Sequence, residues 1–222
     1  MTTAAPAQFK ITYTTANVDM DLFHRLFDEA LAKVRSEAGR THPLYIDFKP
    51  VATAGEPLVD TSPIDTSVVL GKFAAATPEN IDSAVRSAKK AQKAWEKLGY
   101  QGRVKLMRRA AELIRERKFE LAALMSLEVG KSRMEAMGDA EESADLVDYY
   151  CQQVEDAQGY VRPLGKLQPN EKTLSVLRPY GVFVCIAPFN FPMALSTGMS
   201  SAALLAGNGV VYKPAQDTPW TG

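Results

Sequence analysis

Residues 182–186 constrain the fold most strongly, because they form an unbroken run of apolar residues that are mostly β-branched or aromatic. The run reads VFVCI, and its β-branched and aromatic side chains are typical of a parallel strand that is buried on both faces. Pro188 marks the end of this strand. Parallel strands occur with covering helices, so the run predicts an α/β fold.

The residues that follow supply a helix and a second strand. Pro192 suits the first turn of a helix, where a missing N–H costs nothing, and residues 193–206 are rich in Ala, Ser and Met, which can lie close on a sheet. Residues 207–209, Gly-Asn-Gly, end this helix because Gly and Asn tolerate the left-handed conformation. A second short strand follows at residues 210–212. The segment therefore predicts a right-handed βαβ crossover.

A βαβ unit has a preferred place for a ligand. In an open α/β sheet, ligands bind beyond the carboxyl ends of the strands, which here are the loops of residues 187–190 and 213–217. Both loops carry polar groups. No GxGxxG motif follows the first strand, so an ordinary Rossmann dehydrogenase is disfavoured.

The same segment resembles the aldehyde dehydrogenase superfamily. Its members share a PxGV strand, an [IA]xP[WF]NFP turn, an ALAAGN helix end and a KPAExTP strand end. The chain matches these motifs at residues 179–182, 186–192, 204–208 and 213–219. The resemblance implies the N-terminal part of the aldehyde dehydrogenase fold, with helices, a small β-flap and the first βαβ of a Rossmann-like NAD(P) domain.

The resemblance also implies a catalytic role for Asn190. Its carboxamide would form the oxyanion hole and donate a hydrogen bond to the aldehyde oxygen as that oxygen gains negative charge. From the spacing alone, a helix N-cap ahead of Pro192 is an equally good interpretation of Asn190.

Cofactor contacts are implied at the ends of both strands. The residues expected to bind NAD(P) are Ile186, Ala187, Pro188, Phe189, Lys213 and Gln216. Lys213 would hydrogen-bond the adenosine ribose, and its alternative interpretation is a solvated strand end. Gln216 stands where many NAD-preferring members have Glu. A neutral amide does not repel a 2′-phosphate, so we expect NAD and leave NADP open.

The family's cysteine nucleophile and glutamate base lie downstream of the KPAE strand, so the resemblance places both beyond Gly222. The two cysteines of this chain do not replace the nucleophile. Cys185 lies in an apolar strand and Cys151 on an apolar helical stripe, so both are expected to be buried and structural. Two unpatterned cysteines also indicate a reducing compartment. The chain alone is therefore expected to be inactive.

Helices and short strands are predicted upstream of this segment. The predicted helices span residues 19–38, 77–98, 102–118, 119–128 and 133–158, and the extended segments span residues 44–48, 51–59, 62–73 and 172–178, with a turn at residues 54–56. Thr77 followed by Pro78 is a strong helix start.

Charged side chains on these helices are interpreted as solvated. Glu135 and Asp139 lie one turn apart, a spacing that acid–base chemistry could use, but a solvated helix face is the favoured interpretation. Basic residues within 103–118 alternate with acidic ones, which indicates a salt-bridged solvent face. His24 and His42 are isolated, so no metal site is predicted.

Composition limits the partners of the chain. Its 26 basic residues balance 26 acidic ones and the isoelectric point is near 6.8, so nothing indicates nucleic acid as a partner. The sequence begins without a basic stretch or an apolar core, and it has no run of about 18 apolar residues. We therefore expect a cytoplasmic protein that binds no membrane, and the resemblance implies a small-molecule aldehyde as its substrate.

The expected organisation has three parts. Residues 1–42 are interpreted as an N-terminal arm and helix, residues 43–178 as a helical layer, and residues 179–222 as the start of the NAD(P)-binding domain. The resemblance implies that strands within residues 43–73 and 160–178 form a β-flap that pairs with a partner subunit. A homo-oligomer is therefore expected.

A looser resemblance narrows the subfamily. The first helix, HPLYID at residues 42–47, the EVGK turn at residues 128–131 and DLVDYYCQQ at residues 145–153 are most similar to 1-pyrroline-5-carboxylate dehydrogenases. These enzymes oxidise L-glutamate γ-semialdehyde to L-glutamate in proline degradation. The alternatives are a broad-range aldehyde dehydrogenase, and a non-catalytic fragment whose two parallel strands leave apolar faces uncovered.

Overall fold

The computed structural model describes residue 10, residues 19–51, residue 53 and residues 55–222, and its mixed helices and strands confirm the α/β class. The elements are α1 (Met20–Glu37), β1 (Arg40–His42), β2 (Leu44–Ile46), β3 (Lys49–Val51), β4 (Leu58–Thr61), β5 (Val69–Phe73), α2 (Pro78–Lys97), α3 (Gly99–Glu116), α4 (Lys118–Val129), α5 (Arg133–Asp156), the 3₁₀ turn η2 (Gln158–Tyr160), β6 (Val161–Pro163), β7 (Leu174–Val176), β8 (Val182–Ile186), α6 (Ala194–Leu205) and β9 (Gly209–Lys213). The expected N-terminal arm and Ala54 of the expected turn lie outside the described residues.

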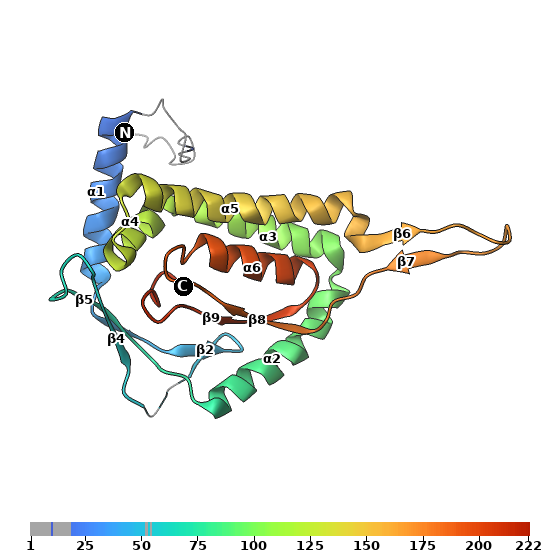
Figure 1. Cartoon of the computed structure of the whole chain (residues 1–222), viewed down its shortest axis with the longest axis horizontal. Helices are drawn as coiled ribbons and strands as arrows, with labels where there is room; N and C mark the ends of the chain where they lie inside the picture. Colours follow the sequence, from blue (N-terminus) through green and yellow to red (C-terminus); the bar gives the residue numbers. More distant parts are fainter. Residues whose placement is uncertain (1–9, 11–18, 52, 54) are drawn as a thin grey trace.

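Helix α5 is the centre of the helical layer. It packs against α3, α4 and α6, and α1 packs against α4 (Figure 1). One core cluster lies around α1, α4 and the start of α5 and includes Phe23, Phe27 and Met125. A second core cluster joins α3, α5 and α6 through Val104, Cys151 and other residues. Helix α6, which contacts β8 and β9, is thereby packed on the helical layer.

Local sequence signals set several helix boundaries, although α3 begins at Gly99, before the expected start at residue 102, and α5 ends at Asp156, before the expected end at residue 158. Thr77 forms a capping box with Asn80 at the start of α2, which confirms the predicted start. Ser132 and Glu135 form a second capping box at the start of α5. Gly130 ends α4 in the left-handed conformation, with φ of 80°.

Strands β8 and β9 form a parallel pair, and α6 connects them, so the βαβ unit is confirmed. Helices α6 and α2 both contact this pair. The prediction that the first strand is buried on both faces was wrong. In β8, Phe183, Val184 and Ile186 are exposed and only Cys185 is buried. Among the described residues β8 pairs only with β9, so its other edge has no partner strand.

The N-terminal strands are shorter than expected. The extended segment 51–59, with its turn at residues 54–56, was too long, because β3 ends at Val51 and β4 begins at Leu58. Strands β2 and β3 form an antiparallel hairpin instead, whose turn residues Asp47 and Phe48 both have positive φ. Of residues 62–73, only β5 is a strand, and it pairs with β4 and in parallel with β1.

A second hairpin extends away from the body of the molecule. Strands β6 and β7 pair antiparallel, with Val161 opposite Val176, and Figure 1 shows them projecting beyond the end of α5. The expected strand 172–178 is thus confirmed in a shorter form, Leu174–Val176.

Two charges expected on the solvent face are buried. Arg103 packs under α6, and its Nε donates to the carbonyl oxygen of Leu205 at 3.0 Å. Lys118 Nζ donates to Glu141 Oε1 at 2.6 Å, and each side chain is only 3% exposed. Other charges remain outside as expected, for example Arg109, which pairs with Glu112. The buried charges were missed because their partners come from helices distant in sequence.

The buried pair makes a prediction for stability. Lys118→Met leaves the Glu141 carboxylate buried without its cation, and we expect a loss of about 3–5 kcal/mol in the free energy of unfolding. Urea denaturation followed by circular dichroism measures this loss. As a control, Arg109→Ala removes an exposed pair and is expected to cost less than about 1 kcal/mol. A Lys118→Met variant as stable as this control would contradict the assignment.

Candidate functional site

The predicted site residues meet at the carboxyl ends of β8 and β9. Ile186 is paired with Lys213 across the sheet, and the N–H of Ala187 donates to the carbonyl oxygen of Lys213 at 3.0 Å. Residues 187–189 leave β8 and residues 214–216 leave β9, so both loops start at the same edge. The structure thus brings together the cofactor residues that the sequence predicted, and their roles stay predictions.

Apolar and polar groups are both exposed at this edge. Ile186 is 63% exposed and Phe189 is 56% exposed, although both are large hydrophobic residues. Lys213 is exposed, and its Nζ donates to the carbonyl oxygen of Pro214 at 2.9 Å. Gln216 lies exposed in the turn after β9. Apolar surface beside hydrogen-bonding groups fits a dinucleotide, whose rings need contact surface and whose ribose hydroxyls need polar partners.

Asn190 lies exposed in the bend between β8 and α6. Among the described residues, no hydrogen bond holds its carboxamide. Its interpretation as a helix N-cap was wrong, because α6 begins at Ala194 and Met193 is the N-cap, without a side-chain hydrogen bond. Pro192 likewise precedes α6 rather than lying within it. The side-chain donors of Asn190 are therefore available to a ligand.

Asp139 from α5 takes the capping role at the start of α6. Its Oδ1 accepts a hydrogen bond from the N–H of Ala194 at 2.7 Å, and its side chain is fully buried. The prediction of a solvated helix face was wrong for Asp139. It is confirmed for Glu135, which is exposed. One signal in the sequence fits this burial: the small residues Ala136 and Ser143 lie one turn away on either side of Asp139, and both are buried.

Lys131 completes this arrangement from the turn after α4. Its Nζ donates to Asp139 Oδ2 at 2.6 Å and lies 3.7 Å from the centroid of the Phe191 ring, next to Asn190 in sequence. Burial raises the pKa of Asp139, while the hydrogen bonds from Lys131 and Ala194 act in the opposite direction. The resemblance marked Lys131 as part of a turn, and gave it no partner.

The far side of the same loop is tied to β9. The hydroxyl of Tyr212 donates to Ser196 Oγ at 2.9 Å, and Ser196 Oγ donates to the carbonyl oxygen of Pro192. Tyr212 directly precedes Lys213. The Asn190 loop is thus connected to the strand that carries the predicted ribose contact.

Both cysteines are buried and unpaired, as the sequence predicted. Burial raises the pKa of Cys151 to about 11, so its thiol stays protonated near neutral pH. The carbonyl oxygen of Val104 accepts from Cys151 Sγ at 3.9 Å. A thiolate nucleophile is therefore disfavoured at Cys151.

A pair of buried carboxyl groups fixes the segment that follows β9. Glu128 accepts hydrogen bonds from the N–H of Trp220 at 2.6 Å and from the N–H and hydroxyl of Thr221. Asp60 of β4 faces Glu128 and is also buried. Burial raises the pKa of Glu128 to about 8 and that of Asp60 to about 6. Glu128 belongs to the EVGK turn, and no motif in the sequence pointed to Asp60 as its partner.

Within the described residues, no group of three or more His, Cys, Asp or Glu side chains is arranged to hold a metal ion. Over the same residues, every helix is too short or too polar to cross a membrane.

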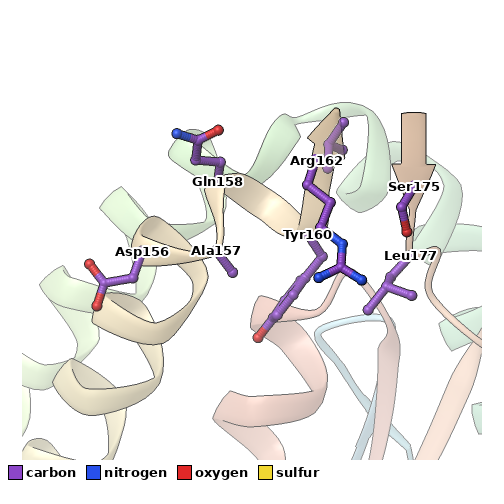
Figure 2. A pocket seen from close by; sticks show the side chains of 8 residues that line it. Asp156, Ala157, Gln158, Tyr160, Arg162, Ser175 and Leu177 are labelled. Atoms are coloured by element: carbon purple, nitrogen blue, oxygen red, sulfur yellow. The ribbon is translucent and has the colours of Figure 1, made fainter. Parts of the chain in front are cut away.

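A cavity of about 430 Å³ lies away from the predicted residues. Figure 2 shows it at the base of the β6–β7 hairpin, where Tyr160, Arg162 and Leu177 approach one another. Neither the Asn190 loop nor the end of β9 contributes to its lining. The cavity therefore has no part in the site built from β8 and β9.

Comparison with known proteins identifies relatives in sequence. The sequence model described as the aldehyde dehydrogenase family matches residues 51–222. A 1-pyrroline-5-carboxylate dehydrogenase of Staphylococcus haemolyticus is 36% identical over 195 residues, which cover 88% of this chain and 37% of the relative. The chain thus spans well under half the length of the curated relatives it matches.

Solved structures agree in fold. A 1-pyrroline-5-carboxylate dehydrogenase from Thermus with bound NAD matches with a TM-score of 0.80 and 35% identity, covering 98% of this chain and 41% of that protein. Lactaldehyde dehydrogenase from Escherichia coli matches with a TM-score of 0.73 and 30% identity, covering 83% of this chain and 38% of that protein.

The pair of Asp60 and Glu128 makes a prediction for pH dependence. The pKa of Glu128 is raised from 4.5 to about 8, so between these values the folded protein keeps a proton that the unfolded chain releases. The contribution of this group to stability is therefore greatest below about pH 4.5 and falls as the pH rises towards 8. Glu128→Gln is expected to flatten this fall.

Urea denaturation midpoints at pH 5 and pH 8 test the prediction. Glu112→Gln, on the exposed face of α3, is the control and should keep the slope of the unchanged protein. An equal slope in Glu128→Gln and in the unchanged protein would rule out Glu128 as its source.

Proposed function

This chain belongs to the aldehyde dehydrogenase family, and on that premise we propose that it forms the oxyanion and cofactor side of an NAD(P)-dependent enzyme that oxidises an aldehyde to a carboxylate. One observation carries the proposal. The carboxamide of Asn190 is exposed at the carboxyl edge of β8, with no hydrogen-bond partner among the described residues. A free amide donor at the ligand edge of a parallel sheet is suited to bind a substrate oxygen.

The chemistry of Asn190 follows from its two amide hydrogens. When a thiolate adds to an aldehyde, the carbonyl oxygen gains negative charge, and an N–H donor stabilises that charge more than the neutral carbonyl. Such a donor contributes about 3–4 kcal/mol. The thiolate and the base that assists hydrolysis would come from residues beyond Gly222, so the 222 residues alone are proposed to be inactive.

The residues around Asn190 are proposed to bind and orient NAD, which accepts the hydride when bound. Exposed Ile186 and Phe189, with Ala187 and Pro188 between them, would provide apolar contact surface. Lys213 Nζ would exchange its intramolecular bond to Pro214 for a ribose hydroxyl. The side-chain amide of Gln216 would bind a second hydroxyl, and its lack of charge leaves NADP open.

The proposed substrate is L-glutamate γ-semialdehyde. The named sequence relative and the Thermus structure are both 1-pyrroline-5-carboxylate dehydrogenases, and the Thermus structure covers 98% of this chain, against 83% for lactaldehyde dehydrogenase. The greater coverage favours this substrate over a broad-range aldehyde dehydrogenase.

We also propose a cytoplasmic homo-oligomer that assembles through the β-flap strands. The β6–β7 hairpin has only two strands, and Val161, Leu174 and Val176 are exposed on it. A two-stranded hairpin is marginally stable alone, so a partner subunit would stabilise it.

Asn190→Ala tests the proposed function in a polypeptide that contains residues 1–222 together with the family's cysteine and glutamate. We expect kcat to fall by about 10²–10³-fold, because the oxyanion loses its donor. The assay follows NADH formation from L-glutamate γ-semialdehyde, and parallel assays with NADP and with a simple aliphatic aldehyde test the cofactor and the substrate. Light scattering on the same preparation tests the oligomer.

Asn170→Ala is the matched control, because Asn170 is an exposed asparagine in the hairpin loop, remote from the predicted site. It should leave kcat unchanged. If Asn190→Ala kept kcat within about twofold of the parent, the oxyanion role would be wrong. A monomeric mass would contradict the proposed assembly.

A further inference from the structure

We propose that the buried ion pair of Lys131 and Asp139 is a positioning element for Asn190, and that it sets the direction in which the Asn190 carboxamide points. This inference rests on the proposed function, because it concerns the same oxyanion site. Lys131 and Asp139 are positioning residues, since neither has to touch the substrate.

Asn190 needs such a device because its own side chain is not anchored. With no internal hydrogen bond to hold the carboxamide among the described residues, its position depends on the backbone of the loop that carries it. That loop joins the end of β8 to Ala194, the first residue of α6. An oxyanion donor acts only within hydrogen-bonding distance of the developing charge, so a small shift of the backbone is costly.

Asp139 fixes the loop on the helix side. It is fully buried and both of its oxygens are used, one by the N–H of Ala194 and the other by Lys131 Nζ, at 2.7 and 2.6 Å. A buried carboxylate with two short hydrogen bonds has little freedom to move. The partial positive charge at the start of α6 also favours the anionic carboxylate. The first turn of α6 is therefore held at one place on α5.

Lys131 fixes the residue next to Asn190. Gly130 turns the chain at the end of α4, and Lys131 then reaches Asp139 and the face of the Phe191 ring. The ammonium lies 3.7 Å from the ring centroid, a distance at which cation and ring attract each other. One buried cation thus links Phe191 to Asp139, and Asn190 lies immediately before Phe191 in the chain.

The structure contains a second ion pair for comparison, which also has its carboxylate on α5. Lys118 and Glu141 form a second buried pair between α4 and α5, also at 2.6 Å. The hydrogen bonds of this pair do not extend to the Asn190 loop. A purely structural role of Lys131 and Asp139 would make the two pairs behave alike in kinetics, whereas the positioning role separates them.

The experiment is a double-mutant cycle in the polypeptide described for Asn190→Ala. Lys131→Met and Asp139→Asn are each made in the parent and in the Asn190→Ala background. In the parent, each is expected to lower kcat by about ten- to hundredfold while the KM for NAD changes by less than about twofold. In the Asn190→Ala background, each is expected to change kcat by less than about twofold, because the group they position is gone.

Lys118→Met is the control and should leave kcat within about twofold of its parent in both backgrounds, at a temperature where circular dichroism shows every variant to be folded. Asp139→Asn keeps the shape of the side chain and an oxygen for Ala194, so it carries the test if Lys131→Met does not fold.

Two results would overturn the positioning role: a kcat of Asp139→Asn within twofold of the parent, or the same fractional loss in both backgrounds. An unchanged kcat in Asn190→Ala alone would instead overturn the proposed function. The two failures are therefore distinguishable.

Discussion

The arrangement of the site depends on the buried Asp139 carboxylate and its two hydrogen bonds. Removing a carboxylate from water costs several kcal/mol, and the cost is offset only if a cation and hydrogen-bond donors meet it in good geometry. Here the cation is Lys131, which follows α4, and the donor is the N–H of Ala194, which begins α6. The charge is satisfied only when the turn after α4, the second turn of α5 and the start of α6 dock together. Burial of one charge thus joins the helical layer to the βαβ unit.

The placement of the strand ends follows from this docking. Once the start of α6 is fixed on α5, the length of the helix sets where β9 begins, and the parallel register with β8 brings Ile186 beside Lys213. The hydrogen bonds from Tyr212 to Ser196 and from Ser196 to Pro192 then connect β9 to the start of α6. The two halves of the predicted site are therefore related through α6, although no predicted cofactor residue lies in that helix.

Sequence reasoning identified the features that depend on local chemistry. The capping box at Thr77 and the motifs of the βαβ unit predicted real elements, because caps and strand ends are set by residues adjacent in the chain. The short strands β3 and β4 were misjudged, because a strand is stabilised by its pairing partner, and β4 pairs with β5 across a connection. Lys118 and Asp139 were assigned to solvent for a related reason. An amphipathic pattern predicts one buried face for a helix, whereas α5 is in contact with three helices, α3, α4 and α6. A charged side chain between such helices is buried where a neighbouring segment supplies a group of opposite charge, as for Lys118 with Glu141 and Asp139 with Lys131.

The two asparagines of the βαβ unit show how structure separates a fold residue from a site residue of the same type. Asn208 is buried, and both ends of its carboxamide are used: Oδ1 accepts from the N–H of Gly181 at 2.9 Å, and Nδ2 donates to the carbonyl oxygen of Ala203 at 3.1 Å. Asn190 is exposed, and within the described chain neither end has a partner. A buried amide that bonds to its own chain at both ends stabilises that chain and is not accessible to a ligand. The Asn190 carboxamide has free donors, so it adds little to the stability of the fold. Its position at the edge where ligands bind suits it to bind a ligand instead.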